Sequence, residues 1–526
     1  MLQILKSHKK VSIVAAIAFL VSSILFVLPW GQKGYSYPEL TRAEVTETVS
    51  QYLQETSEFS AEEINLIETN VDMGLGRHIE FELNDEEYEL VFEHIPVYTI
   101  QATLDNSFSV VHVHPLENRV VGAENIAIPM NHDESVETFI HKIFHSEYKL
   151  VEEVESVSTG LIQLNDVFLS KYTDRTQFTF EGPFDYEGIK EIITVDVGTS
   201  IEDDSKFVLG FMHSAEVAPQ YMVSDETTRE IISALIVLLI LGVLVFASLI
   251  HFIVKASKRK VAFKLPLAIT IFLSVFGLIF GYVYTGKIDG WSWMEVGLSA
   301  WLVFFILAMT IPVDTHFLKG KPFRDKLTQS LIGMKSPILL GLLLAIISHP
   351  LSEIFFMIAD RIGGAWFSPV TFYEIYLIEN VWLLPFFVLS IGITAAIMEE
   401  TVFRRYLASA MDRIHPIFAV LVTSFLWAVL HMGYDVFPWY LRIIELTLII
   451  GPFLYWVYKK YGFLTVIYCH YFYNSLLISM SLLSFRVDVA IVSFLLTLSP
   501  LLLFFYKRKK IALEVATDEE IEQSVI

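Results

Sequence analysis

Long apolar runs separated by short polar stretches occupy most of this chain. A run of about 20 apolar residues can cross a bilayer as a helix. The first run covers residues 11–30, and the others follow the polar stretch that ends near residue 230: 231–254, 265–284, 294–313, 338–359, 381–398, 416–432, 443–458, 463–483 and 487–506. The pattern predicts an α-helical polytopic membrane bundle of about ten transmembrane helices.

Residues 31–228 interrupt this pattern. Residues 41–59 place Val45, Val49 and Leu53 on one helical face, and a second helical segment lies at residues 134–148. Each helical segment precedes stretches with the spacing of strands: 78–83, 88–92, 98–104, 107–114, 177–181, 189–197 and 206–212. We therefore expect an α+β domain inserted after the first helix, with a repeated order that suggests two tandem units.

Charge divides the chain in the same way. The net charge is −22, but residues 31–228 hold 39 acidic and 10 basic residues and carry −29, which leaves +7 for the remainder. Basic residues concentrate in the cytoplasmic loops of membrane proteins. The division predicts a multi-pass protein of the cell membrane, with both termini cytoplasmic and residues 31–228 extracytoplasmic. So acidic a domain is unsuited to nucleic acid and favours basic partners.

The first apolar run has the flanks of a secretory signal, because Lys6, Lys9 and Lys10 precede it. However, the run is long for a signal peptide, and no small-residue cleavage site follows it at residues 29–33. We interpret residues 1–30 as an uncleaved transmembrane anchor.

Histidines supply candidate metal ligands in the predicted outer domain. These are His78, His94, His112 and His114, of which His112 and His114 share one face of a strand. Solvated strand histidines are the favoured interpretation, and no catalytic motif accompanies them.

A charged cluster ends the apolar run 381–398. It consists of Glu399, Glu400, Arg404 and Arg405. Glu400 precedes Arg404 by four residues, so the two can pair on one helical face. Glu399 lies about 100° around the helix from Glu400 and lacks that partner, which makes it the candidate general base. Charged residues inside a membrane are a functional hypothesis by default. The alternative is a charged helix end at the cytoplasmic surface.

Two further apolar runs carry polar pairs at helical spacing: Trp427 with His431, and His470 with Asn474. Either histidine alone fits a structural, hydrogen-bonded role. Together with a carboxylate, two imidazoles suit a Zn²⁺-bound water, which makes Glu399, His431 and His470 candidate metal ligands. Straight helices would place His431 about 22 Å along its helix from Pro416. A shared site therefore requires the Glu399 helix to continue inside the bundle, or the next helix to tilt or begin deeper.

These motifs resemble those of the CPBP (CAAX protease and bacteriocin-processing, or Abi) family of intramembrane proteases. EETVFR at 399–404, WAVLH at 427–431 and HYFYN at 470–474 are similar to its EExxxR, FxxxH and HxxxN motifs. The resemblance covers about residues 374–483 and implies a CAAX-protease-like metalloendopeptidase. It implies that Glu399 activates water with His431, that Glu400 and Arg404 support it, and that His470 and Asn474 bind metal or stabilise the oxyanion. Whether Zn²⁺ takes part, or glutamate alone, stays open.

Two positions depart from the family pattern. Trp427 replaces a phenylalanine, and Arg405 stands where a glycine commonly follows the motif arginine. The glycine allows a neighbouring backbone to approach closely, so Arg405 puts that approach in doubt.

We therefore divide the chain into five parts: an anchor (1–30), the acidic outer domain (31–228), transmembrane helices (229–372), a CPBP-like protease core (373–485), and a last helix with a cytoplasmic tail (486–526). The predicted function is hydrolysis of a peptide bond in a membrane-associated protein or peptide within the lipid bilayer. A non-enzymatic sensor or scaffold whose outer domain binds an external partner is the alternative, and a transporter is a third reading that lacks an inverted repeat. The substrate cannot be read from the sequence.

Overall fold

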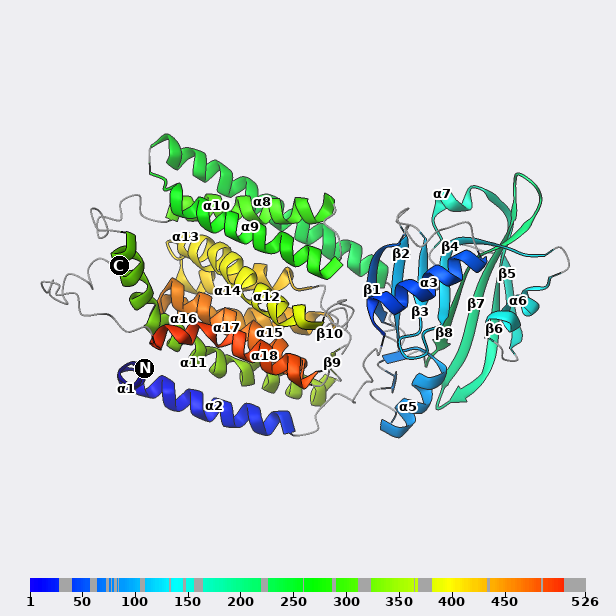
Figure 1. Cartoon of the computed structure of the whole chain (residues 1–526), viewed down its shortest axis with the longest axis horizontal. Coiled ribbons are helices and arrows are strands. Elements are labelled where there is room, and N and C mark those ends of the chain that lie inside the picture. Colours follow the sequence, from blue (N-terminus) through cyan, green and yellow to red (C-terminus); the bar gives the residue numbers. More distant parts are fainter. Residues whose placement is uncertain are drawn as a thin grey trace, which may run out of the picture.

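The computed structural model contains a mostly helical bundle and a separate β-sheet domain (Figure 1). The structure describes these residues: 1–27, 40–56, 64–71, 75–76, 78–79, 83, 85–104, 109–131, 134–144, 148–155, 164–218, 226–258, 260–285, 290–310, 323–363, 365–367, 381–432, 436–483 and 486–505. All statements below concern those residues.

The β-sheet domain is one eight-stranded antiparallel sheet in the order β1-β2-β3-β4-β8-β7-β6-β5. The strands are β1 (Ile64–Val71), β2 (Tyr98–Leu104), β3 (Val110–Val113), β4 (Val120–Pro129), β5 (Lys149–Glu155), β6 (Tyr172–Tyr186), β7 (Ile189–Ser200) and β8 (Lys206–Glu216). The helices are α3 (Arg42–Thr56), α5 (Asp85–His94), α6 (Val136–Phe144) and α7 (Asp166–Leu169). Helix α3 precedes the first half of the sheet and α6 precedes the second half, and β4 joins β8 in the middle. The division into two tandem units stays a prediction.

The core of this domain lies between the sheet and its helices. As the sequence predicts, α3 buries Val45, Val49 and Leu53. These side chains pack in one apolar cluster with residues of the central strands, including Phe211, and with Phe139 of α6. The apolar face of each helix is therefore what attaches it to the sheet.

Two predicted strands are wrong. Residues 88–92 lie within α5, and residues 78–79 are helical. The segment Tyr88 to Phe92 fits a two-residue period as well as a helical one, but Val91 and Phe92 are adjacent and both buried, as one side of a helix allows. The sequence interpretation also missed β1, β4 and β5.

The prediction of solvated strand histidines is wrong for His78, His112 and His114, which are 2%, 1% and 0% exposed. His94, at the end of α5, is exposed. A further histidine of the sheet, His213, is 3% exposed. His112 shares a hydrogen bond of 3.1 Å with the Thr99 hydroxyl. His114 Nδ1 accepts backbone N–H groups of the following turn, and His213 Nε2 lies 2.9 Å from a Glu191 oxygen. Such partners make buried imidazoles tolerable.

Burial also shifts their protonation. Burial, with the charge of Arg119 adding to it, lowers the pKa of His114 to about 4, and burial lowers the pKa of His213 despite the Glu191 carboxylate. For Glu191, burial would raise the pKa, but hydrogen bonds from His213 and Tyr148 outweigh it and lower the pKa. Both histidines are thus neutral, and Glu191 ionised, at pH 7.

We expect acid to destabilise the sheet domain. The unfolded chain binds a proton at position 114 below pH 6.5, whereas the folded domain resists it down to about pH 4. Stability is therefore full above pH 6.5 and falls by about 3 kcal/mol between these values. Hydrogen exchange of the β3 and β8 amides, corrected for intrinsic rates, measures this loss. His114→Asn, which keeps an acceptor for the turn, should flatten the dependence; equal protection at pH 7 and pH 4.5 in the wild type would contradict it.

The helical bundle contains the apolar runs. Its helices are α1 (Leu2–Ser7), α2 (Lys9–Val27), α8 (Glu226–Ser257), α9 (Lys264–Thr285), α10 (Gly290–Thr310), α11 (Phe323–Gly363), η4 (Val381–Leu383), α12 (Leu384–Glu399), η5 (Glu400–Ala408), α13 (Ser409–Met411), α14 (Pro416–Val429), α15 (Tyr440–Glu445), η6 (Leu446–Ile450), α16 (Gly451–Tyr461), α17 (Phe463–Ser481), α18 (Val487–Thr497) and η7 (Ser499–Phe505). A two-stranded ribbon, β9 (Trp366–Phe367) with β10 (Val436–Phe437), completes it.

Five helical segments in the described part are long and apolar enough to cross a membrane, or six if the bent pair α18 and η7 is one span. Three further apolar helices are shorter: 264–279, 296–310 and 416–429. Every predicted apolar run overlaps a helix, but the predicted number of ten transmembrane helices is not confirmed. The chain is a multi-pass membrane protein with a separate sheet domain.

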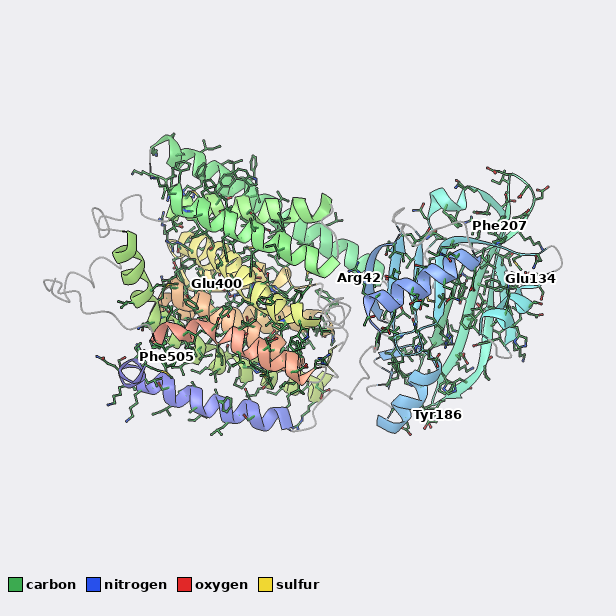
Figure 2. All side chains as sticks on the ribbon, viewed as in Figure 1. Arg42, Glu134, Tyr186, Phe207, Glu400 and Phe505 are labelled. Atoms are coloured by element: carbon green, nitrogen blue, oxygen red, sulfur yellow. The ribbon has the colours of Figure 1, made fainter. Side chains whose placement is uncertain are left out.

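The two described ends of the chain lie at one end of the bundle. The N-terminus and Phe505 are both on the side away from the β-sheet domain (Figures 1 and 2). If the bundle crosses a membrane along its helices, the sheet domain and these two ends are on opposite sides.

Candidate functional site

The helix that carries the glutamate pair does not end at Glu399. α12 continues directly into η5, a π-helix, and then into α13, so one apolar helical segment runs over Val381–Met411. Wide π turns often occur at functional sites. Of the two ways to bring Glu399 near His431, the structure has the first: the Glu399 helix continues inside the bundle. The interpretation of the cluster as a charged surface end is wrong, because Glu400 is 0% and Arg404 1% exposed.

Glu400 is the central charge of the cluster. It lies in the helix bundle (Figure 2), where its Oε1 is 3.2 Å from Arg404 Nη1 and accepts a hydrogen bond of 2.8 Å from His470 Nδ1. The predicted pairing with Arg404 is confirmed. Because Nδ1 of His470 donates to a carboxylate, the other ring nitrogen, Nε2, is left to face the rest of the site.

Glu399 is beside this pair but more open. Its side chain is 24% exposed, and its Oε2 lies 3.8 Å from His470 Nε2. The same oxygen accepts a hydrogen bond from the indole N–H of Trp427. Glu399 thus has a fixed orientation and keeps its other carboxylate oxygen for a further partner.

Trp427, which the sequence presents only as a replacement for the motif phenylalanine, has a functional contact that the sequence did not predict. Its indole N–H donates to Glu399, and its ring lies 4.5 Å from the Arg404 guanidinium. Its ring is also edge-on to His431 and His470, with centroids 5.1 and 5.9 Å away. A phenylalanine could form the ring contacts but not the hydrogen bond.

His431 follows the C-terminal end of α14. Its Nδ1 donates to the Trp427 carbonyl oxygen at 2.8 Å, which fixes the ring and directs Nε2 elsewhere. Asn474 lies one turn beyond His470 on α17 and is half-buried. Among the described residues, no hydrogen bond joins Asn474 to Glu399, Glu400 or His431.

The candidate zinc ligands do not form a ligand set in this arrangement. No group of three or more His, Cys, Asp or Glu side chains within the described ranges could hold a metal ion. Glu399 Oε2 lies 3.8 Å from His470 Nε2, whereas His431 packs against the Trp427 ring, which lies beside both groups. Zn²⁺ binding stays a prediction.

Two glycines allow α17 to bring His470 close. A side chain at Gly341 of α11 would collide with the backbone of Tyr468 and Cys469, and one at Gly392 of α12 would collide with Ser475. α17 is therefore held against both helices, one of which leads into the glutamate pair.

At the position where the family pattern has a glycine, Arg405 forms hydrogen bonds to a neighbouring helix. Its Nε donates to the Thr310 hydroxyl and its Nη2 to the Thr310 carbonyl oxygen, both at 2.9 Å, at the end of α10. Its guanidinium also lies 4.6 Å from the Phe463 ring at the start of α17. The departure from the family glycine thus attaches the π-helix to two neighbouring helices.

Comparison with known proteins agrees with the motifs. Residues 381–476 match the family described as type II CAAX prenyl endopeptidase Rce1-like. The sporulation-killing factor biosynthesis protein SkfC of Bacillus subtilis (strain 168) is 33% identical over 104 residues, which are 19% of this chain and 20% of SkfC. The chain therefore matches only about a fifth of that relative's length. No solved structure matches significantly.

Proposed function

We propose, from the premise that residues 381–476 form an Rce1-like domain, that this chain is an intramembrane endopeptidase. It hydrolyses a peptide bond in a membrane-associated protein or peptide. The observation that carries the proposal is the buried Glu400 with its two partners, Arg404 and His470, directly beside the more open Glu399 carboxylate. A purely structural ion pair would not need a second acid at its edge.

In the proposed reaction, Glu399 takes a proton from water while His431 Nε2 accepts the other water hydrogen and orients it. The water oxygen bonds to the peptide carbonyl carbon, and the Asn474 amide donates to the oxygen that becomes negative. The carbon–nitrogen bond then breaks, and Glu399 returns its proton to the leaving nitrogen. His470, fixed by Glu400, positions Glu399.

The proposal includes an orientation of the chain in the membrane. The described chain ends are proposed to be cytoplasmic and the acidic sheet domain extracytoplasmic, where it could bind an external partner or admit substrate. The sensor or scaffold alternative explains the sheet domain but gives no role to the buried charges around Glu400.

Fragment analysis tests the function. Membrane-protein fragments are compared by mass spectrometry in cells that contain the wild-type chain, a His431→Ala chain or no copy. We expect new protein termini with the wild type that disappear with His431→Ala. His141→Ala, an exposed histidine of α6, is the matched control and should keep them. Identical fragment sets with and without the chain would contradict the proposal.

A further inference from the structure

A group of polar side chains lies inside the bundle and includes none of the proposed catalytic residues. We call it the second polar cluster. It brings together three helices that are each long and apolar enough to span a membrane. Its members are His349, Ser352 and Glu353 of α11, Arg442 and Glu445 of α15, and Tyr473 of α17.

In the half of the cluster that contains Glu445, the charges balance. Glu445 is 0% exposed, accepts a hydrogen bond of 2.6 Å from the Ser352 hydroxyl and pairs with Arg442 at 2.7 Å. One carboxylate and one guanidinium cancel, so this pair needs no further charge.

In the other half, which contains His349 and Glu353, buried polar atoms lack a hydrogen-bond partner among the described residues. His349 Nδ1 lies 3.1 Å from Glu353 Oε1, and the two side chains are only 12% and 17% exposed. Glu353 Oε2 and His349 Nε2 are buried and have no hydrogen-bond partner among the described residues. A carboxylate oxygen buried in a membrane segment without a donor is costly. Glu353 Oε2 can therefore accept a further hydrogen bond, and a carboxylate oxygen bonds most strongly to a positively charged donor.

The position of the pair relates it to the proposed catalytic site. The His349 ring lies 6.1 Å from the Tyr473 ring, and Tyr473 follows His470 by three residues on α17, a rise of about 4.5 Å along the helix axis. Moreover, the π-helix η6 begins directly after Glu445, as η5 begins directly after Glu399. Each polar centre thus adjoins its own π-helix.

We propose that Glu353, with His349, forms a specificity subsite that receives a basic side chain, lysine or arginine, of the peptide substrate; this rests on the proposed protease function. An ammonium or guanidinium donates to Glu353 Oε2 in a charge-assisted hydrogen bond. The long apolar stem of such a side chain lets its charged end reach a group that lies among apolar helices. The net charge of −29 on residues 31–228 would attract a cationic segment toward the same protein.

The test maps cleavage sites in wild-type, Glu353→Gln and Glu353→Lys chains expressed in full length. Fragments absent from a Glu399→Gln strain define the true sites. We expect lysine or arginine at one fixed position from the cut bond in the wild type. In Glu353→Gln, the preference for lysine over norleucine in synthetic peptides should fall about 10- to 100-fold, the value of one charge-assisted hydrogen bond. Glu353→Lys should shift the preference to acidic residues.

Asp360→Asn is the matched control, because it removes a carboxylate from the same helix outside the cluster. It should leave the preference unchanged. Sites that depend on Glu399 but show no basic preference, or one unaffected by Glu353→Gln, would overturn the subsite and leave the protease standing. Absence of any Glu399-dependent site would instead refute the protease itself. If Glu353→Lys does not fold, the isosteric Glu353→Gln still decides the question.

Discussion

Replacing Glu399 by glutamine is expected to lower the rate of peptide cleavage by about 10²–10⁴-fold, the usual contribution of a general base. The amide keeps the shape of the side chain, and its oxygen can still accept the Trp427 N–H that now holds Glu399. It cannot take a proton from water. The loss should therefore appear in the rate of the chemical step and not in substrate binding.

Single-turnover cleavage of a substrate peptide, with the protein in lipid nanodiscs, separates these two quantities. Asp412→Asn is the control: this carboxylate lies at the end of the same helical segment, bound to Tyr455 and Lys459, and its loss should leave the rate within a few-fold. If Glu399→Gln cleaves at the wild-type rate, another group activates the water.

Local spacing explains what the sequence could predict about this site. Glu400 and Arg404 are four residues apart, and that interval alone predicted their contact, which the structure confirms. His470 lies 70 positions from Glu400, and no periodicity relates them. The chemistry of two imidazoles with a carboxylate, and then the family resemblance, placed His470 at the same site, but neither indicated its contact with Glu400.

The π-helix could not be predicted from periodicity. Its local pattern fits an α-helix as well, and its contacts with other helices, such as that of Arg405 with Thr310, are not contained in that pattern. By contrast, the second polar cluster had a sequence signal that was overlooked. His349 and Glu353 are four residues apart, and Arg442 and Glu445 three apart, in or beside apolar runs.

The sheet domain shows the same limit. Helix α3 was predicted with its three buried residues because its pattern is local. Strand β5 was missed, since Val151 to Glu153 are all exposed at the edge of the sheet and show no alternation. Strands at an edge are defined by their neighbour, which the sequence pattern does not contain.

Replacing Glu400 by glutamine should destabilise the bundle by about 3–5 kcal/mol, the cost of leaving one partner of a buried ion pair unpaired. Arg404, 1% exposed, would keep its charge and lose its carboxylate partner, while its guanidinium would keep its contact with the Trp427 ring at 4.5 Å. His470 Nδ1 would lose its charged acceptor. Denaturant unfolding in mixed micelles, followed by tryptophan fluorescence, measures the loss.

The double variant Glu400→Gln with Arg404→Met separates stability from activity. Removing both charges eliminates the unpaired guanidinium, so we expect most of the lost stability to return. Cleavage should stay low, because His470 would still lack the carboxylate that orients it toward Glu399. If the double variant regains activity along with stability, Glu400 acts only as a counter-charge for Arg404. If the single variant is as stable as the wild type, the ion pair contributes nothing to the fold, and Glu400 is retained for His470 alone.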